Sequence, residues 1–93
     1  MDQLPKAGNL LKPVLLALIS LGGSGSVEEI EKEVIRSLNV SDQIASLIRS
    51  GRRTELNYRL SWARTRGKNL GYIERKSFKV WVITEKGKTA ILN

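Results

Sequence analysis

The chain has 93 residues, of which 41% are hydrophobic, and it contains neither cysteine nor histidine. This length fits one small globular domain, and the missing residue types exclude disulfides, the usual zinc ligands and the common histidine-based nucleophile pairs, so we expect no catalytic residues, no metal and no cofactor. The net charge of +7 is uneven, because Met1 to Ile48 carries −2 whereas Arg49 to Lys79 holds ten basic and two acidic residues, which favours a polyanion-binding surface over a merely solvated one.

The first half of the chain predicts helices only. Helices are expected over 13–21, 27–38 and 42–48. Pro13 fits a first helical turn, and the first helix is apolar on much of its circumference, as is typical of a core helix. Ser26 and Glu29 have the spacing of a capping box for the second helix. Leu47 and Ile48, at the end of the third, are expected to face inward.

The second half predicts a long helix, a β-hairpin and a last short helix. These elements are expected over 55–70, 72–75, 80–84 and 85–93. Thr54 is expected to cap the long helix and Gly71 to end it, and Trp81 is expected in the core. Packed helices followed by a hairpin are the plan of the winged helix, a variant of the helix-turn-helix. The predicted fold class is therefore mainly α (α+β), with a helical core and a two-stranded β-hairpin wing.

The long helix has two contrasting faces. Leu56, Leu60, Ala63, Gly67 and Leu70 cluster on a helical wheel and form the expected buried stripe. The opposite face mixes cations with hydroxyl and amide groups, which suit phosphates and base edges, whereas a solvated surface helix would more often interleave glutamate. We therefore expect a recognition helix that enters the major groove. The side chains expected to contact bases and sugar edges are those of Asn57, Tyr58, Ser61, Arg64, Thr65 and Lys68.

The loops beside this helix supply further cations. Arg52 and Arg53 precede the helix, whose N-terminal dipole favours anions, and are expected to bind phosphates. Lys76 and Lys79 lie in the hairpin connection and are expected to reach an adjacent phosphate or the minor groove. Phe78 between them either folds back onto the domain or touches a sugar or groove wall.

Trp62 lies at the edge of the buried stripe of the long helix. An aromatic ring there either packs against the hairpin or stacks on a base. We expect it to pack against the hairpin.

Four ordered segments carry a recognisable pattern. They are Ser50–Thr54 (SGRRT), Tyr58–Thr65 (YRLSWART), Leu70–Arg75 (LGYIER) and Val80–Gly87 (VWVITEKG). This set resembles the N-terminal domain of Mrr-type restriction proteins, closely in the second half of the chain and only in the helix pattern in the first. The resemblance implies a winged helix that recognises DNA and, in larger members, delivers a nuclease domain to foreign or modified DNA.

The chain departs from the family pattern at several positions. Gly67 stands where the family has leucine and Leu70 where a small residue is usual, which resembles a compensating exchange of volume. Lys79 stands where the wing often has glycine, and Tyr58 where asparagine is common. Glu74–Lys76 spells the E-x-K fragment of such nucleases but lacks a suitably spaced aspartate, so no metal site is predicted.

These features together predict one winged-helix domain over residues 1–93 that binds double-stranded DNA. It is expected in the cytoplasm, without membrane contact, either alone or as the N-terminal module of a larger restriction endonuclease. Any nuclease activity would reside in a partner domain, in cis or in trans. The alternatives are a free-standing winged-helix transcriptional regulator, which would bind a paired site as a dimer, and a winged helix used for protein interaction, which would need an exposed apolar patch.

Overall fold

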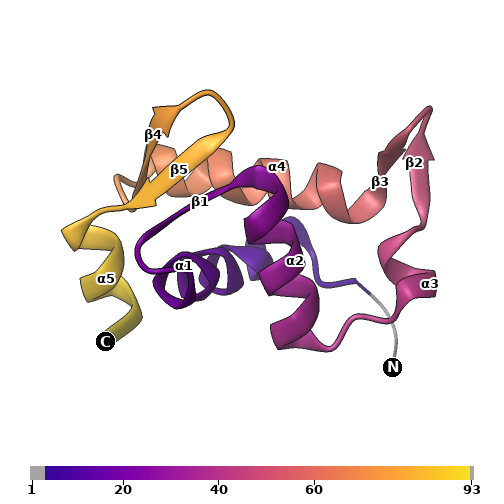
Figure 1. The fold of residues 1–93 in the computed structure, drawn as a ribbon, viewed down its shortest axis with the longest axis horizontal. Helices are drawn as coiled ribbons and strands as arrows, with labels where there is room; N and C mark the ends of the chain where they lie inside the picture. Colours follow the sequence, from indigo (N-terminus) through magenta and orange to yellow (C-terminus); the bar gives the residue numbers. More distant parts are fainter. Residues whose placement is uncertain (1–3, 93) are drawn as a thin grey trace.

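The computed structural model describes residues 4–92. In chain order its elements are η1 (Ala7–Leu10), α1 (Leu11–Ser20), β1 (Ser24–Ser26), α2 (Val27–Leu38), α3 (Asp42–Ala45), β2 (Ile48–Ser50), β3 (Arg53–Thr54), α4 (Glu55–Asn69), β4 (Ile73–Ser77), β5 (Val80–Ile83) and α5 (Glu85–Leu92). Most of these residues are helical, with a small antiparallel sheet formed largely near the C-terminal end (Figure 1). The expected class, an α+β fold of winged-helix-like arrangement, is confirmed.

Helix α1 is the centre of the core, as its apolar circumference predicted. It contacts η1, α2, α4, α5 and the sheet. Val14 and Leu18 are fully buried against Ile30 of α2 and Leu60 of α4 within one cluster. Each such side chain stabilises the fold by about 1.5–3 kcal/mol relative to an exposed one. This single cluster fixes how α2 and α4 are placed around α1.

The start of α2 confirms the predicted capping box. The Ser26 hydroxyl accepts from the Glu29 backbone N–H at 3.0 Å, and the Glu29 carboxylate accepts from the Ser26 N–H at 2.8 Å. Two of the backbone donors at this helix end are thereby satisfied. The helix ends at Asn39, whose φ of 55° is left-handed.

The sheet has three strands where the sequence predicted two. Its order is β1-β5-β4, with Gly25 opposite Trp81 and Glu74 opposite Val82. The additional strand is β1, in the first half of the chain where only helices were predicted, and it pairs with the free edge of β5. Trp81, expected in the core, is only partly buried and packs against the outside of the core cluster.

The third helix was predicted too long. It ends at Ala45, and Ile48–Ser50 instead pairs with Arg53–Thr54 in a short antiparallel hairpin. Gly51 closes the turn with a left-handed φ of 53°. The expected inward position of Leu47 and Ile48 is wrong, because both are exposed, Ile48 by 61%.

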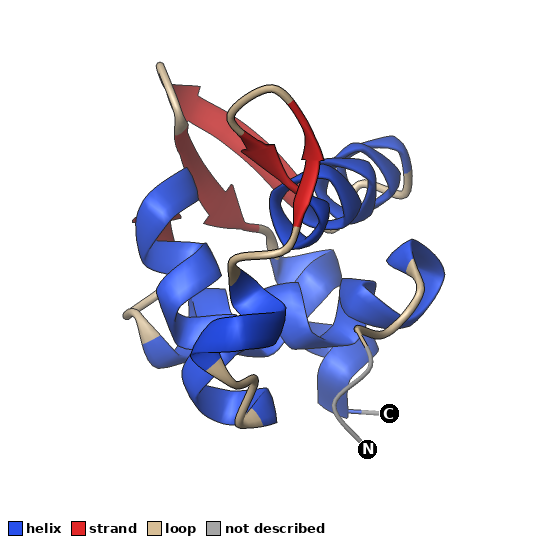
Figure 2. Ribbon diagram, turned by 90° about the vertical axis from the view of Figure 1, so that its right-hand side faces the viewer, coloured by secondary structure: helices blue, strands red, loops and turns tan. Residues whose placement is uncertain are grey.

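Helix α4 crosses the molecule, with a hairpin at each end. Thr54 caps it as predicted, since its hydroxyl accepts from the Asn57 N–H at 3.0 Å. Gly71 follows its end with a φ of 80°. Leu70 lies just past the last helical residue and is 36% exposed, so its expected place on the buried stripe is wrong. The two hairpins rise on the same side of the molecule (Figures 1 and 2).

Helix α5 packs against α1 and lies below β4 and β5 in the view of Figure 1. Its start lies against Thr84, whose hydroxyl accepts from the Gly87 N–H at 3.1 Å. The predicted final helix is thus confirmed as far as Leu92, and the expected last residue, Asn93, lies outside the described residues.

Candidate nucleic-acid interface

The outward face of α4 lies between the β2–β3 and β4–β5 hairpins (Figure 1). Thr65 and Lys68 are exposed on this face, and Ser61 is half-buried. The Thr65 hydroxyl donates to the Ser61 carbonyl at 3.1 Å, which leaves its oxygen lone pairs free to accept from outside the helix. These three predicted side chains therefore lie together on one polar, solvent-facing strip.

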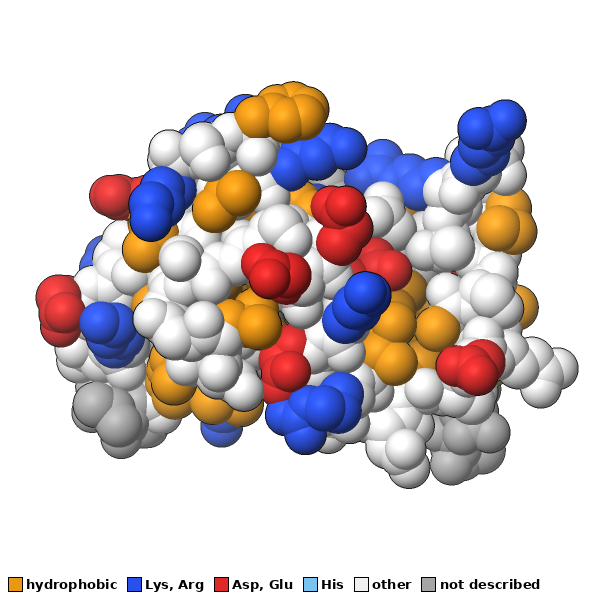
Figure 3. Space-filling view, in the orientation of Figure 1, with side chains coloured by type: hydrophobic (Ala, Val, Ile, Leu, Met, Phe, Trp, Pro, Cys, Tyr) orange, Lys and Arg blue, Asp and Glu red, His pale blue; other side chains and the backbone are white. Residues whose placement is uncertain are grey.

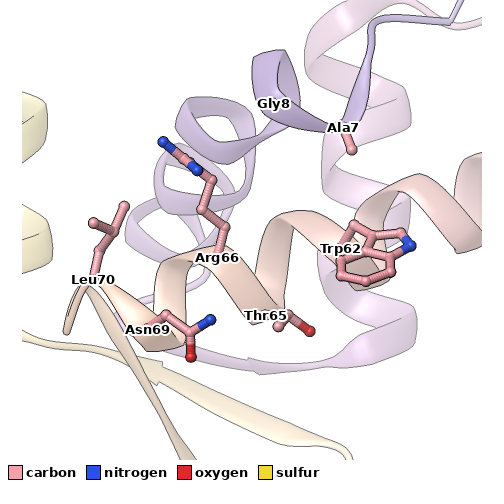
Figure 4. Close-up of a pocket in the computed structure, with 7 residues that line it drawn as sticks. All are labelled: Ala7, Gly8, Trp62, Thr65, Arg66, Asn69 and Leu70. Carbon is pink, nitrogen blue, oxygen red and sulfur yellow. The ribbon is translucent and has the colours of Figure 1, made fainter.

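Trp62 does not pack against the β4–β5 hairpin, so that expectation is wrong. It is 54% exposed and its ring meets that of Tyr58 edge-on, with centroids 6.4 Å apart. It borders a shallow hollow of about 420 Å³ between η1 and α4. The residues that line the hollow are Ala7, Gly8, Trp62, Thr65, Arg66, Asn69 and Leu70. Figure 4 shows Arg66 reaching toward η1, whereas Thr65 and Asn69 point to the other side of α4.

Tyr58 is half-buried beneath two guanidinium groups. The guanidinium carbon of Arg49 lies 3.5 Å from the centroid of the Tyr58 ring, and that of Arg53 lies 5.4 Å from it. Both arginines belong to the β2–β3 region, so the ring attaches this hairpin to α4. Arginine stacked on an aromatic face is a favourable cation–π arrangement.

Glu55 holds the base of the same hairpin. Its carboxylate accepts from Arg49 at 3.1 Å and from Arg59 at 2.7 Å. Arg59 in turn donates to the Leu4 and Pro5 carbonyls at 2.9 and 3.1 Å. The hydrogen bond from Arg59, helped by that from Arg49, holds the pKa of the Glu55 carboxyl below its usual value against the opposing effect of desolvation. The carboxylate is therefore ionised at neutral pH and fastens the hairpin to the first turn of α4.

Asn57 links the hairpin to α2. Its amide oxygen accepts from Arg53 Nε at 2.9 Å, and its amide nitrogen donates to the Glu31 carboxylate at 3.4 Å. Asn57 is half-buried, and both ends of its amide already have partners. Binding to a base by Asn57 would use the amide N–H and the oxygen lone pair that these two hydrogen bonds leave over, in the orientation that they fix.

Arg64 was expected at the edge of the exposed face, but the structure buries it. Its exposure is 9%, and its Nη1 is enclosed without a hydrogen-bond partner among residues 4–92. Desolvation, and then the charge of Arg53, lower the pKa of the Arg64 guanidinium, while Glu31 partly offsets this effect. Direct contact between Arg64 and DNA would require its side chain to leave this position.

The β4–β5 hairpin carries its cations at an exposed tip. Lys76 and Lys79 are both exposed there. Lys79 adopts a left-handed φ of 57°, and its carbonyl accepts from the Val27 N–H at 2.9 Å, which ties the tip to the start of α2. Of the two alternatives for Phe78, folding back is not observed: the side chain is 78% exposed, with the Lys79 ammonium 5.4 Å from its ring centroid.

The charges divide into two zones. Lys and Arg side chains gather along the edge of the molecule that runs between the two hairpin tips, and most acidic side chains visible in this view lie below that edge (Figure 3). Glu28 and Glu29 are exposed in the first turn of α2. Those carboxylates, together with the capping box, make the N-terminus of α2 unsuited to a phosphate. The Lys and Arg side chains are therefore concentrated on α4 and its hairpins and not at the start of α2.

A model of the Mrr N-terminal domain family matches residues 8–93. The chain belongs to this family. Comparison with curated proteins and with solved structures gives no match.

In this Mrr N-terminal domain, two of the four segments that carried the family resemblance lie along the edge just described. Ser50–Thr54 forms the tip of the β2–β3 hairpin and the cap of α4, and Tyr58–Thr65 forms the middle of α4. The sequence did not predict the β2–β3 hairpin, although the Ser50-Gly51 pair, typical of a turn, lies at its tip. Because the hairpin was not predicted, Arg49, whose guanidinium lies over the Tyr58 ring, was missing from the predicted site.

Other chemistry finds no support in the described part of this Mrr N-terminal domain. Glu74 and Lys76 of the E-x-K fragment are exposed strand residues. Residues 4–92 contain no group of three side chains suited to hold a metal ion. Over the same residues, no helix combines the length and apolar character that crossing a bilayer demands.

Proposed function

We propose that this Mrr N-terminal domain binds double-stranded DNA as the recognition module of a restriction system and performs no catalysis itself. The observation that carries the proposal is the concentration of Lys and Arg side chains along one edge, around the outward face of α4 (Figure 3). Such an edge matches the phosphate backbone, which dominates the affinity of proteins for DNA. A nuclease domain, in cis or in trans, would act on the DNA that this module holds in the cytoplasm.

Helix α4 enters the major groove in this proposal. An α-helix with its side chains is about 10–12 Å wide and the groove is about 12 Å wide, so one exposed helix fits. Ser61, Thr65 and Lys68 then face the base edges. Asn57 and Tyr58 are less accessible contacts, because both are engaged within the protein.

The phosphate contacts come from both ends of α4. Arg52 and Arg53 lie at its N-terminus, where the helix dipole adds to their charge. Lys76 and Lys79 lie on the β4–β5 wing and reach an adjacent phosphate or the minor groove. Arg64 supports the interface from beneath, since its guanidinium lies within the influence of Arg53 and Glu31.

Titration of a duplex at several salt concentrations tests the proposal. If about six cations meet phosphates, log K falls with log salt at a slope near −5, which weakens binding about 10³-fold between about 50 and 200 mM salt. A slope near −1 would contradict the proposal. Arg53→Glu is expected to weaken binding to every duplex, whereas Thr65→Ala is expected to alter the preference among duplexes.

The same assay addresses base modification. Duplexes that differ only in adenine or cytosine methylation, compared at fixed salt, show whether a modified base is part of the ligand. The molecular mass in solution with and without a palindromic duplex separates this function from that of a dimeric transcriptional regulator, which would double in mass on a paired site.

A further inference from the structure

The β2–β3 hairpin projects from the domain without contributing to the core. All three residues of β2 are exposed, and the residues described as core belong to other elements. The backbone pairing is limited to Ile48 with Thr54 and Ser50 with Arg53. A two-stranded hairpin of this size is not stable by itself in water. Its position therefore depends on side-chain contacts with α4.

Three contacts on α4 hold the hairpin. Arg49 lies over the Tyr58 ring at 3.5 Å and donates to the Glu55 carboxylate at 3.1 Å. Arg53 donates to Asn57 at 2.9 Å and also lies above the same ring. The hairpin backbone adds one more link, because the Glu55 N–H donates to the Leu47 carbonyl at 2.8 Å. Ring, carboxylate and amide thus fix a segment that otherwise has no anchor.

The hairpin presents a cation at its tip. Arg52 is exposed and, within residues 4–92, its side chain has neither a hydrogen bond nor an ion pair. Gly51 supplies the left-handed residue of the turn that places it there. A shallow hollow opens at the base of the hairpin, and its lining residues are Glu31, Arg52, Arg53, Thr54 and Asn57. This tip and that of β4–β5 rise on the same side, with α4 between them (Figure 1).

We propose that the β2–β3 hairpin is a second wing that binds the DNA backbone on the far side of the major-groove segment occupied by α4. Arg52 binds the phosphate, the β4–β5 wing binds at the other end of α4, and the duplex is held at two separate places. Tyr58 is a positioning residue: it holds the second wing through Arg49 and does not read a base. This inference rests on the proposed function, since it assumes that α4 lies in a groove.

Cleavage of the duplex by an iron chelate attached to each wing shows where that wing lies on the DNA. The chain has no cysteine, so Ser50→Cys and Ser77→Cys each give one attachment site for an iron chelate, in the second wing and in the β4–β5 wing respectively. Two discrete clusters of strand cuts, one on each side of the segment covered by α4, are the expected result. Cuts from Ser77→Cys alone, with none at a discrete position from Ser50→Cys, would overturn the second wing but leave DNA binding intact. Failure of the unlabelled protein to bind any duplex would instead overturn the proposed function.

Substitutions in the wing separate contact from positioning. Arg52→Ala is expected to lower the magnitude of the salt slope by about 1, without changing amide exchange of residues 48–54 in the free protein. Tyr58→Ala is expected to lower the magnitude of the salt slope by a similar amount and to speed amide exchange of residues 48–54 at least tenfold. Tyr58→Phe keeps the ring beneath Arg49, so it is expected to restore both the slope and the slow exchange. Lys88→Ala in α5 is the control for an unrelated cation.

A second variant tests the same contact in case Tyr58→Ala does not fold. Arg49 is exposed on its side chain by 41%, so Arg49→Ala leaves the core untouched while removing the contact with the ring. It is expected to speed hairpin exchange as Tyr58→Ala does. Slow exchange in Arg49→Ala, or a change of base preference in Tyr58→Phe, would refute the positioning role.

Discussion

Arg64 shows how one side chain can leave the face that its helical position suggests. Its side chain is buried, and its guanidinium lies within the electrostatic influence of Arg53 and of Glu31 on α2. Burying a guanidinium atom without a partner is costly, because the lost hydration is not replaced by hydrogen bonds. The fold tolerates this cost for a residue whose charge adds to the cationic edge around α4.

Replacement of Arg64 by an apolar side chain of similar length removes that cost. Arg64→Met is expected to raise the free energy of unfolding by about 1–2 kcal/mol, measured by urea denaturation. Arg66→Met, at an exposed position on the same helix, is the matched control and is expected to change it by less than about 0.5 kcal/mol. A loss of stability in Arg64→Met would show that the guanidinium is satisfied in solution.

Lys79 occupies a backbone conformation that favours glycine, with a φ of 57°. Lys79→Gly is expected to raise the free energy of unfolding by about 0.5–1 kcal/mol, since the left-handed strain outweighs the entropy of glycine. The same change is expected to lower the magnitude of the salt slope for DNA by about 1, because one cation is lost from the wing.

Asn39→Gly is the matched control for Lys79→Gly, which is expected to raise stability and to weaken DNA binding. Asn39 has a similar φ of 55° at the end of α2, and asparagine tolerates this region better than lysine. Asn39→Gly is expected to change stability less and to leave DNA affinity unchanged. An equal loss of affinity in both variants would exclude a specific contact by Lys79.

At the scale of elements, α5 is docked through a close approach of two backbones. A Cβ atom at Gly87 would lie 2.3 Å from the Tyr72 carbonyl oxygen and 2.9 Å from Ile83 Cγ1. The approach lets Thr84 contact both the strand end and the helix start: its hydroxyl lies 2.6 Å from the Gly71 carbonyl oxygen and accepts from the Gly87 N–H. Glycine in a helix is intrinsically unfavourable, so its place here reflects packing and not propensity.

Gly87→Ala is therefore expected to destabilise the domain, by about 2–3 kcal/mol in thermal or urea unfolding, although alanine is the better helix former. Gly8→Ala is the control, because a Cβ at Gly8 meets nothing within 4 Å. If Gly87→Ala proved as stable as the parent, α5 would have to shift without cost, and the close approach would not fix its position.

At the scale of the whole molecule, the position of the charge matters more than its total. Lys and Arg side chains gather along the edge that runs between the two hairpin tips (Figure 3), whereas α5 and the far end of α2 lie away from that edge (Figure 1). At physiological salt, screening limits the electrostatic attraction between exposed charges to a distance of about 8–10 Å. In the proposed complex with DNA, cations on the far side therefore contribute little to the affinity.

Charge reversal on each side tests this statement, because the two variants have the same net charge and differ only in where the charge is changed. Lys76→Glu on the β4–β5 wing and Lys88→Glu on α5 both lower the net charge by two. Only Lys76→Glu is expected to weaken duplex binding strongly and to lower the magnitude of the salt slope by about 1, as measured by fluorescence anisotropy. Equal losses in the two variants would mean that total charge, not the cationic edge, drives binding.

Local signals were enough to predict much of the framework. The capping box of Ser26 and Glu29, the Thr54 cap and the Gly71 end each depend on residues a few positions apart. The helical period of Leu56, Leu60 and Ala63 likewise predicted which side of α4 is buried. The same period placed Ser61, Thr65 and Lys68 on the exposed side, so this part of the candidate site could be derived without the fold.

The remainder depended on contacts between distant parts of the chain. β1 exists because β5 offers a free edge, and the β2–β3 hairpin stands because Tyr58 and Glu55 of α4 hold its arginines. Arg64 is buried by the packing of other elements against α4, which no single-helix wheel contains. The sequence by itself therefore determined the helices, their caps and the cationic character of the second half. Only the tertiary structure decided which cations stay free and which are fastened within the protein, because that depends on neighbours brought together by packing of the core.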